Sequence, residues 1–258
     1  MSRVICICNQ KGGVGKTTTA VNVSACLALS KKKTLLIDID PQANASTGVG
    51  FRLQQGEASV YNALIGQVEP DVVVRTTEIE GFHIIPSSQD LIGAEVEFVS
   101  LEGRELFLSK LIQKIKSDYD YILIDCPPSL GFLTLNALVA AELVLIPIQC
   151  EYYALEGVSA LLRTIQKIKQ IFNESLLIQG FVLTMFDSRN NICHQVVDNV
   201  RKNLGSQVFK TVIPRNVRLS EAPSFGKPVV LYDSQSTGAT SYLALAMEIL
   251  DVELKRDN

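Results

Sequence analysis

Residues 11–18 read Lys-Gly-Gly-Val-Gly-Lys-Thr-Thr, after a short apolar run at Val4–Cys8 and before a helix-compatible segment at Thr17–Leu29. A glycine-rich turn between a strand and a helix directs backbone N–H groups and the positive end of the helix dipole at one point. Glycines let such a loop close around phosphate oxygens. The pattern predicts a nucleoside triphosphate site formed by Lys11, Gly12, Gly13, Val14, Gly15, Lys16, Thr17 and Thr18.

Three side chains of this loop have expected roles. Lys16 is expected to reach the β- and γ-phosphates, and the Thr17 hydroxyl is expected to bind Mg²⁺. The loop departs from the ordinary P-loop pattern, because Gln10 stands where the first glycine is expected and Lys11 follows it. A lysine five residues before the P-loop lysine resembles the deviant Walker A ATPases. That resemblance implies that Lys11 crosses a dimer interface to the partner's nucleotide; the alternative is a lysine that only solvates an exposed loop.

The composition is that of a folded protein with a large core, since 47% of the 258 residues are hydrophobic and 20% are charged. Continuous apolar runs alternate with helix-length segments, as expected for parallel strands buried on both faces. We therefore predict one doubly wound α/β domain over residues 1–258, a mostly parallel sheet flanked by helices on both faces. The expected strands are Val4–Cys8, Thr34–Ile37, Phe82–Ile85, Tyr121–Ile124, Leu143–Ile148 and Leu176–Leu183, and the expected helices include Leu106–Ile115 and Leu155–Phe172.

Several classes of protein are excluded by the same sequence. No apolar run approaches ~18 residues, so we expect no transmembrane helix. The first apolar run is too short for a signal peptide. Six cysteines are scattered without a C-x-x-C pair, which favours reduced, buried thiols in a cytoplasmic protein. The two histidines have no neighbouring cluster at metal-ligand spacing, so we expect no structural metal.

Three aspartates follow two of the predicted strands. Asp38 and Asp40 end the second strand, and Asp125 ends a later one and is followed by two prolines. If these strands are neighbours, their carboxyl ends face the phosphate loop. Phosphoryl transfer requires Mg²⁺, charge neutralisation and an oriented water rather than covalent chemistry. An aspartate in this position can instead cap the next helix, and that alternative stays open for Asp38.

Cations are concentrated in the last third of the chain, although the whole chain has a net charge of −3, which argues against a uniformly cationic surface. Residues 189–227 carry seven cations and two acids, a local charge of +5 that leaves −8 on the remainder. A local basic patch suits a phosphate backbone bound without sequence readout. The alternative is a solvated helix face with nucleotide contacts. The cations are Arg189, Arg201, Lys202, Lys210, Arg215, Arg218 and Lys227.

Residues 183–189 (Leu-Thr-Met-Phe-Asp-Ser-Arg), 213–224 and 40–44 resemble signatures of the small ParA/Soj proteins, the partition ATPases of bacterial chromosomes and plasmids. The likeness covers almost the whole chain. It implies an ATP- and Mg²⁺-dependent homodimer, with non-specific double-stranded DNA and a ParB-type DNA-binding protein as partners. It also implies a cytoplasmic, nucleoid-associated location and slow hydrolysis that the partner stimulates. Ala43 departs from the family pattern, in which glycine is common.

The resemblance also assigns roles to individual residues. Asp125 resembles the Walker B aspartate, and residues 125–129 resemble switch II. Asp38 and Asp40 resemble switch I, in which the first aspartate supports the magnesium shell and the second positions or activates the attacking water. Arginines that match Arg189 and Arg218 carry DNA binding. The nucleotide site is expected to include Met185, Pro214, Arg215 and Asn216, with the turn at 214–216 against the adenine.

Three other classes of protein could carry the same nucleotide site. A MinD-like protein binds membrane through a basic amphipathic C-terminal helix, but residues 247–258 hold four acids, two bases and no aromatic residue, the wrong sign for anionic lipid. We therefore expect no membrane partner. An iron–sulfur carrier would need paired cysteines, and Cys126 has no C-x-x-C partner. A biosynthetic ligase or amidotransferase would need a second-substrate pocket and often an added domain.

Overall fold

An eight-stranded sheet forms the centre of the computed structural model, which describes residues 2–152 and 154–254. The strand order is β3-β4-β2-β5-β1-β6-β7-β8, and every neighbouring pair is parallel except β3 with β4. The mostly parallel α/β fold is therefore confirmed. The strands are β1 (Arg3–Ile7), β2 (Thr34–Asp38), β3 (Arg75–Thr76), β4 (Phe82–Ile85), β5 (Tyr121–Asp125), β6 (Leu143–Gln149), β7 (Leu177–Phe186) and β8 (Val208–Pro214).

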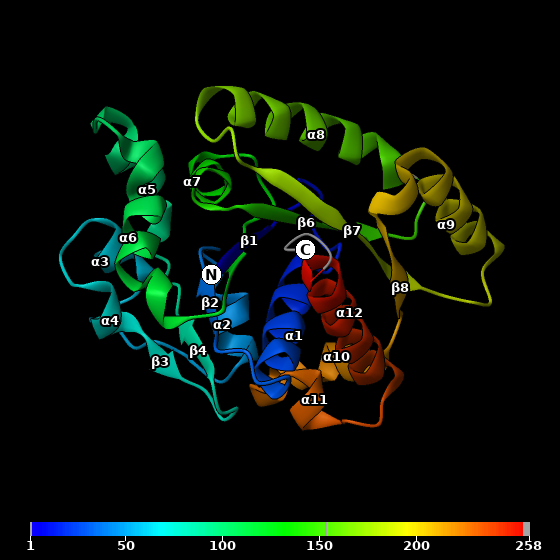
Figure 1. Cartoon of the computed structure of the whole chain (residues 1–258). Coiled ribbons are helices and arrows are strands. Elements are labelled where there is room, and N and C mark those ends of the chain that lie inside the picture. Colours follow the sequence, from blue (N-terminus) through cyan, green and yellow to red (C-terminus); the bar gives the residue numbers. More distant parts are fainter. Residues whose placement is uncertain (1, 153, 255–258) are drawn as a thin grey trace.

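Helices cover both faces of this sheet (Figure 1), because successive strand side chains point to opposite sides and both sides are apolar. In β1, Val4 and Cys6 join one core while Ile5 and Ile7 join the other. One layer contains α1 (Lys16–Leu29), α2 (Asn44–Gly48), α10 (Val217–Glu221), α11 (Val229–Tyr232) and α12 (Thr237–Leu254). The other contains α3 (Val60–Leu64), α4 (Pro70–Val73), α5 (Leu91–Glu97), α6 (Phe107–Ile115), α7 (Phe132–Ala140), α8 (Ala154–Ile171) and α9 (Asn191–Leu204).

The predicted strands are all present, with small shifts at their ends. The largest shift is at β7, which continues to Phe186 rather than ending at Leu183. The sequence did not predict β3 or β8, which lie at the two edges of the sheet. Edge strands are half exposed and lack the continuous apolar run of a buried strand, so their pattern is weak. Residues 255–258 of the acidic tail lie outside the described residues.

The structure also tests the expectations for the cysteines and for membrane-spanning helices. All six cysteines are free and buried, as predicted, and the sulfur atoms of Cys6 and Cys126 lie 3.4 Å apart between β1 and β5. Within residues 2–152 and 154–254, every helix is too short or too polar to cross a membrane.

The central strands place the loops that matter for function. β1 lies between β5 and β6, and β5 also pairs with β2, so the carboxyl ends of β1, β2 and β5 lie side by side. Ligands bind at this edge in open parallel sheets. The phosphate loop leaves β1 there and enters α1, which packs on the sheet beside α12 (Figure 1).

Candidate nucleotide-binding site

The loop between β1 and α1 has the curvature of a phosphate cradle. Gly13 and Gly15 have φ values of 73° and 88°, a left-handed conformation in which a side chain is strained. Lys16 is the first residue of α1, is 6% exposed, and donates from Nζ to the Lys11 carbonyl oxygen at 3.0 Å. The Thr184 hydroxyl donates to the Val14 carbonyl at 2.8 Å and fixes the loop against β7.

The charge on Lys16 is matched by acids across the loop. Burial lowers the pKa of Lys16, and the nearby carboxylates of Asp125 and Asp40 oppose that change. A buried ammonium beside carboxylates makes charge-assisted hydrogen bonds and is a strong phosphate ligand. The structure therefore brings together Lys16, Asp40 and Asp125, which come from three separate segments of the chain.

The Asp125 carboxyl group lacks the well-formed hydrogen bonds that hold the other aspartates of the site. It is fully buried, and neither carboxylate oxygen has a hydrogen-bond partner within the described residues. Burial raises its pKa well above the ordinary value, the nearby Asp38 adds to this effect, and the Thr17 hydroxyl opposes it. An unpartnered buried carboxylate is costly unless a cation compensates it. Thr17 and Asp125 therefore fit a divalent cation, with oxygen donors of the kind that Mg²⁺ prefers.

The site does not form a complete metal cage from protein groups alone. Among residues 2–152 and 154–254 there is no cluster of three or more His, Cys, Asp or Glu side chains that could hold a metal ion. Mg²⁺ needs only one or two carboxylates where substrate phosphates and water supply the other ligands. The donor set therefore suits Mg²⁺ that arrives with a nucleotide.

Asp38 is also buried, but its carboxylate is fully engaged. Its oxygens accept hydrogen bonds from the Ser46 N–H (2.8 Å), the Ser46 hydroxyl (2.7 Å) and the Asp40 N–H (3.1 Å). Burial raises the pKa of Asp38 to about 6. Asp38 is thus held in place beside Asp125, in a position compatible with an outer-shell role and with the capping of α2 through Ser46.

A buried serine network that the sequence did not predict fixes the Asp40 backbone. Ser87 follows β4, and its hydroxyl donates to the Asp40 carbonyl at 2.6 Å. The Ser87 N–H donates to the Ser46 hydroxyl oxygen at 3.0 Å. The only signal in the sequence was that Ser87 follows a strand, Phe82–Ile85, whose neighbour in the sheet could not be read from the chain.

The residues expected around the base line one cavity of about 280 Å³ beside the phosphate loop. Its walls include Gly15, Thr18, Met185, Pro214, Arg215 and Asn216. The Arg215 N–H donates to the Phe186 carbonyl at 2.9 Å, which holds the ends of β7 and β8 together. This volume suits a small planar ring system.

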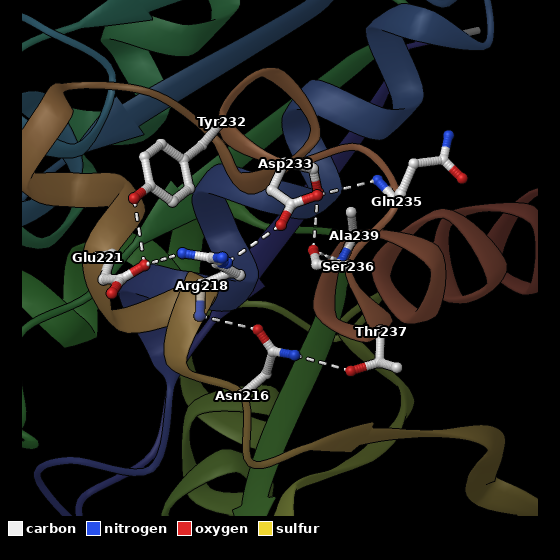
Figure 2. Close-up of polar contacts among 9 residues, drawn as sticks. All are labelled: Asn216, Arg218, Glu221, Tyr232, Asp233, Gln235, Ser236, Thr237 and Ala239. Atoms are coloured by element: carbon white, nitrogen blue, oxygen red, sulfur yellow. Dashed lines mark hydrogen bonds and ion pairs between the residues drawn. The ribbon is translucent and has the colours of Figure 1, made fainter.

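The Asn216 side chain has both of its polar ends engaged. Its oxygen accepts from the Arg218 N–H at 2.9 Å and caps α10, and its amide nitrogen donates to the Thr237 hydroxyl at 2.7 Å (Figure 2). Asn216 therefore contributes to the cavity as a wall and as a tie between α10 and α12.

Lys11 extends from the loop to Glu151, for which the sequence carried no functional signal. Its Nζ lies 3.1 Å from Glu151 Oε2, and the two side chains are 42% and 49% exposed. Exposed ion pairs of this kind are weak and exchange readily. Lys11 is thus accessible from outside the chain, although it is paired within it.

The chain is similar in sequence to known proteins over most of its length. Residues 2–178 match the family model described as an AAA domain. The chain is 53% identical over its full length to the chromosome partitioning protein ParA of Myxococcus xanthus, covering 89% of that protein. It is 51% identical to the sporulation initiation inhibitor protein Soj of Bacillus subtilis, covering 96% of this chain and 98% of that one. The chain belongs to the ParA/Soj family of partitioning ATPases.

The ParA/Soj fold is also shared by a solved structure with a different name. The cobyrinic acid a,c-diamide synthase of Mycobacterium smegmatis, with bound ADP and magnesium, is 37% identical. The two superpose with a TM-score of 0.85 over 97% of this chain and 94% of that one. The fold of this ParA/Soj chain is therefore one that holds ADP and magnesium in a related protein.

In this ParA/Soj chain, the two candidate DNA contacts are arginines held by acids. Arg189, just after β7, binds Asp187 through Nε (2.9 Å) and Nη2 (2.7 Å), and its side chain is 86% exposed. Arg218, in α10, lies between Glu221 and Asp233 (Figure 2). Both arginines are therefore at the surface and both are already paired.

The fold brings further acids to the basic segment, residues 189–227. Acids from outside residues 189–227 contact three of its cations: Asp187 pairs with Arg189, Asp233 with Arg218, and Glu78 with Lys227 at 3.3 Å. The effective charge at these positions is thus lower than the +5 counted along the chain. A count along the sequence misses such acids because they approach through the fold.

Proposed function

We propose that this chain is a Mg²⁺-dependent ATPase that dimerises in its ATP state and then binds double-stranded DNA without sequence preference. The observation that carries the Mg²⁺-dependent ATPase is the fully buried Asp125 carboxyl group beside the Thr17 hydroxyl, at the sheet edge that carries the phosphate loop. The related structure with ADP and magnesium supports the same cofactors for this chain.

Each charged side chain of the site has a role in this proposal. Lys16 and the loop N–H groups hold the β- and γ-phosphates. Thr17 and Asp125 hold Mg²⁺, and Asp38 supports its outer shell. Bound Mg²⁺ supplies neutralisation of the phosphate charge. Asp40, whose backbone carbonyl is held by Ser87 in the loop after β4, orients the attacking water or accepts its proton.

Lys11 provides the link between nucleotide binding and dimerisation. Its ion pair with Glu151 is solvent-exposed and therefore inexpensive to break. In the proposed dimer, Lys11 leaves Glu151 and contacts the phosphates bound by the partner. ATP, with its additional phosphate, then stabilises the dimer more than ADP does.

Dimerisation would also control affinity for DNA. If each subunit provides about three phosphate contacts through Arg189, Arg218 and neighbouring cations, a dimer neutralises roughly six phosphates, and the logarithmic salt slope is about −5. A monomer with half of these contacts binds much more weakly. Nucleotide state would therefore switch DNA binding on and off.

We also propose a cellular location and a protein partner for this ATPase. The chain would act as one P-loop ATPase domain over residues 1–258, in the cytoplasm and on the nucleoid. A ParB-type DNA-binding protein would stimulate its hydrolysis, and the cycle would move or position replicated DNA. The single continuous sheet and the partitioning relatives support this reading.

Two rival functions make different demands. A MinD-like membrane ATPase requires a basic amphipathic C-terminal segment, whereas residues 247–258 are acidic overall. An amide-forming ligase, suggested by the name of the related synthase, requires a site for a second substrate. Two cavities that touch the phosphate loop measure about 260 and 280 Å³, which is small for a nucleotide and a large co-substrate together.

The proposal is tested by the binding of Asp40→Ala protein to random duplex DNA, with ATP and with ADP, across a salt series. This change removes the hydrolytic carboxylate and should trap the ATP dimer. We expect tight, salt-sensitive binding with ATP only. A Lys16→Ala protein, unable to hold the phosphates, should bind weakly in both conditions.

Two results would contradict the proposal. Equal salt slopes with ATP and ADP would separate DNA binding from the nucleotide. The absence of DNA binding with either nucleotide would reject the DNA switch itself, and binding of the same protein to anionic vesicles would then favour the membrane reading.

A further inference from the structure

Arg218 lies between two carboxylates that come from different elements (Figure 2). Its Nη1 is 2.9 Å from Oε2 of Glu221, one turn further along α10, and its Nε is 3.1 Å from Oδ2 of Asp233, which follows α11. The Arg218 side chain is 50% exposed. Two donor nitrogens of the guanidinium are therefore occupied by protein groups, although the group remains within reach of solvent.

Both acids are themselves held in place. The Tyr232 hydroxyl donates to the same Glu221 oxygen at 3.1 Å, and the Gln235 N–H donates to Oδ1 of Asp233 at 3.3 Å (Figure 2). Surface ion pairs are usually weak, in part because two flexible side chains must be ordered. Here the fold has already ordered both acceptors, so Arg218 binds to a preformed acidic site.

The local charge has the wrong sign for a DNA contact. One guanidinium and two carboxylates sum to −1 at Arg218, whereas Arg189 with Asp187 sums to zero. The hydrogen bond from Arg218 lowers the pKa of Glu221, so this carboxylate stays ionised at neutral pH. A phosphodiester that approaches Arg218 in this arrangement meets net negative charge.

The same elements also border the nucleotide site. Asn216, which lines the base cavity, caps α10 next to Arg218 and is bonded to Thr237 in the first turn of α12. Further along α12, the buried Tyr242 hydroxyl lies 3.1 Å from the Thr19 hydroxyl in α1, the helix that begins with Lys16. A movement of α10 relative to α11 and α12 would change both the cavity wall and the Arg218–Asp233 contact.

We propose that Glu221 and Asp233 form an acidic latch that occupies Arg218 and must release it before Arg218 can bind a DNA phosphate. This inference rests on the proposed DNA-binding function and concerns its regulation. The latch competes with phosphodiester groups for one guanidinium. It keeps DNA affinity low in the resting conformation. A nucleotide-dependent shift of α10 separates Arg218 from Asp233, and the exposed pair with Glu221, which lies within α10 itself, is then displaced by the phosphodiester.

The test is a gain of DNA affinity in the ADP state. Glu221→Gln combined with Asp233→Asn keeps the shape of both side chains and removes both charges. We expect this double variant to bind random duplex DNA about 3- to 10-fold more tightly with ADP than the wild type does. The logarithmic salt slope should become steeper by about 0.9, because one more phosphate is neutralised. The gain should be smaller with ATP.

Three controls separate the latch from other causes. Glu102→Gln combined with Glu174→Gln removes two exposed acids elsewhere, so it carries the same change in net charge and should shift DNA affinity less than twofold. Arg218→Ala added to the latch double variant should abolish the gain. Sedimentation with ADP should show the same oligomeric state for the double variant and the wild type.

The outcomes are distinct from those that test the proposed function. A double variant with unchanged DNA affinity, or a gain that survives Arg218→Ala, overturns the latch even when the wild type binds DNA with ATP as proposed. A wild type that binds no DNA, beside a double variant that binds through Arg218, supports the latch and rejects the wild-type DNA switch. Absence of DNA binding by every variant rejects both.

Discussion

Asp38 and Asp125 are register partners at the carboxyl ends of the neighbouring parallel strands β2 and β5, and both carboxyl groups are fully buried. Their environments differ. Asp38 accepts three hydrogen bonds, whereas Asp125 accepts none within the described residues. Two carboxylates in one buried region disfavour each other's ionisation. Burial of this pair therefore lowers the stability of the fold, and a bound cation can restore that stability.

Asp125→Asn should stabilise the nucleotide-free protein while abolishing its response to Mg²⁺. The raised pKa of Asp125 means that the folded protein holds this proton more tightly than the unfolded chain does. Its contribution to stability is therefore lost as pH rises above the ordinary carboxyl range. We expect the variant to gain about 1–3 kcal/mol in the free energy of unfolding at pH 8, and less at pH 5.

Urea unfolding at both pH values, with and without Mg²⁺ and ATP, measures this effect. Asp118→Asn, at an exposed position, is the control and should change stability by less than about 0.5 kcal/mol. A variant that is less stable than the wild type at pH 8 would contradict the assignment of Asp125 as a buried acid whose ionisation destabilises the nucleotide-free fold.

Ser87→Ala should slow ATP hydrolysis without weakening ATP binding. The lost hydroxyl releases the Asp40 carbonyl, so the Asp40 carboxylate is less well placed toward the attacking water. We expect kcat to fall about tenfold with KM within about twofold, because the lost hydrogen bond (~1 kcal/mol) acts through geometry. Ser87→Thr, which keeps the hydroxyl, should restore most of the rate.

Ser88→Ala is the matched control for this experiment. The Ser88 hydroxyl lies 2.9 Å from the Ser59 hydroxyl and contacts neither switch aspartate. Equal losses of kcat in Ser87→Ala and Ser88→Ala would show that the effect is a general loosening of the loop after β4.

Ala43→Gly should stabilise the protein modestly. Ala43 has a φ of 51°, a left-handed conformation that costs energy for any residue with a Cβ. Glycine removes that strain but adds entropy to the unfolded chain, so we expect a net gain of up to ~1 kcal/mol. Thermal unfolding measures it, and Ala20→Gly, within α1, should instead lose at least ~1 kcal/mol. If Ala43→Gly lowers the stability of the protein as much as Ala20→Gly does, backbone strain at Ala43 is excluded.

Lys11→Ala should prevent ATP-dependent dimerisation while monomer affinity for ATP changes less than about threefold. The lysine acts across the proposed interface, whereas the loop N–H groups and Lys16 hold the nucleotide within one chain. Glu151→Gln is the informative control, because it removes the ion pair but keeps the lysine. Light scattering with ATP should show dimers for Glu151→Gln and monomers for Lys11→Ala. Dimers in both would reject a crossing role for Lys11.

Local patterns were sufficient for the fold class and for the phosphate loop. The glycines and lysines at 11–18 act through their own backbone and side chains, and the buried strands carry continuous apolar runs, so both features are visible along the chain. The same reasoning missed β3 and β8, because edge strands lack that signal. The three aspartates were noticed because each follows a predicted strand, and the pairing of β2 with β5 in the structure places Asp38 and Asp125 side by side.

The partners of the functional side chains depend on the tertiary structure. Glu151 reaches Lys11 across 140 residues of sequence, Ser87 reaches Asp40 across 47, and Asp233 contacts Arg218 from the turn before α12. Hydrogen bonds and ion pairs act over a few ångströms in space, and chain separation carries no information about them. Residue types and their spacing therefore determined which chemistry is present, whereas packing of the strands and helices decided which groups hold it in place.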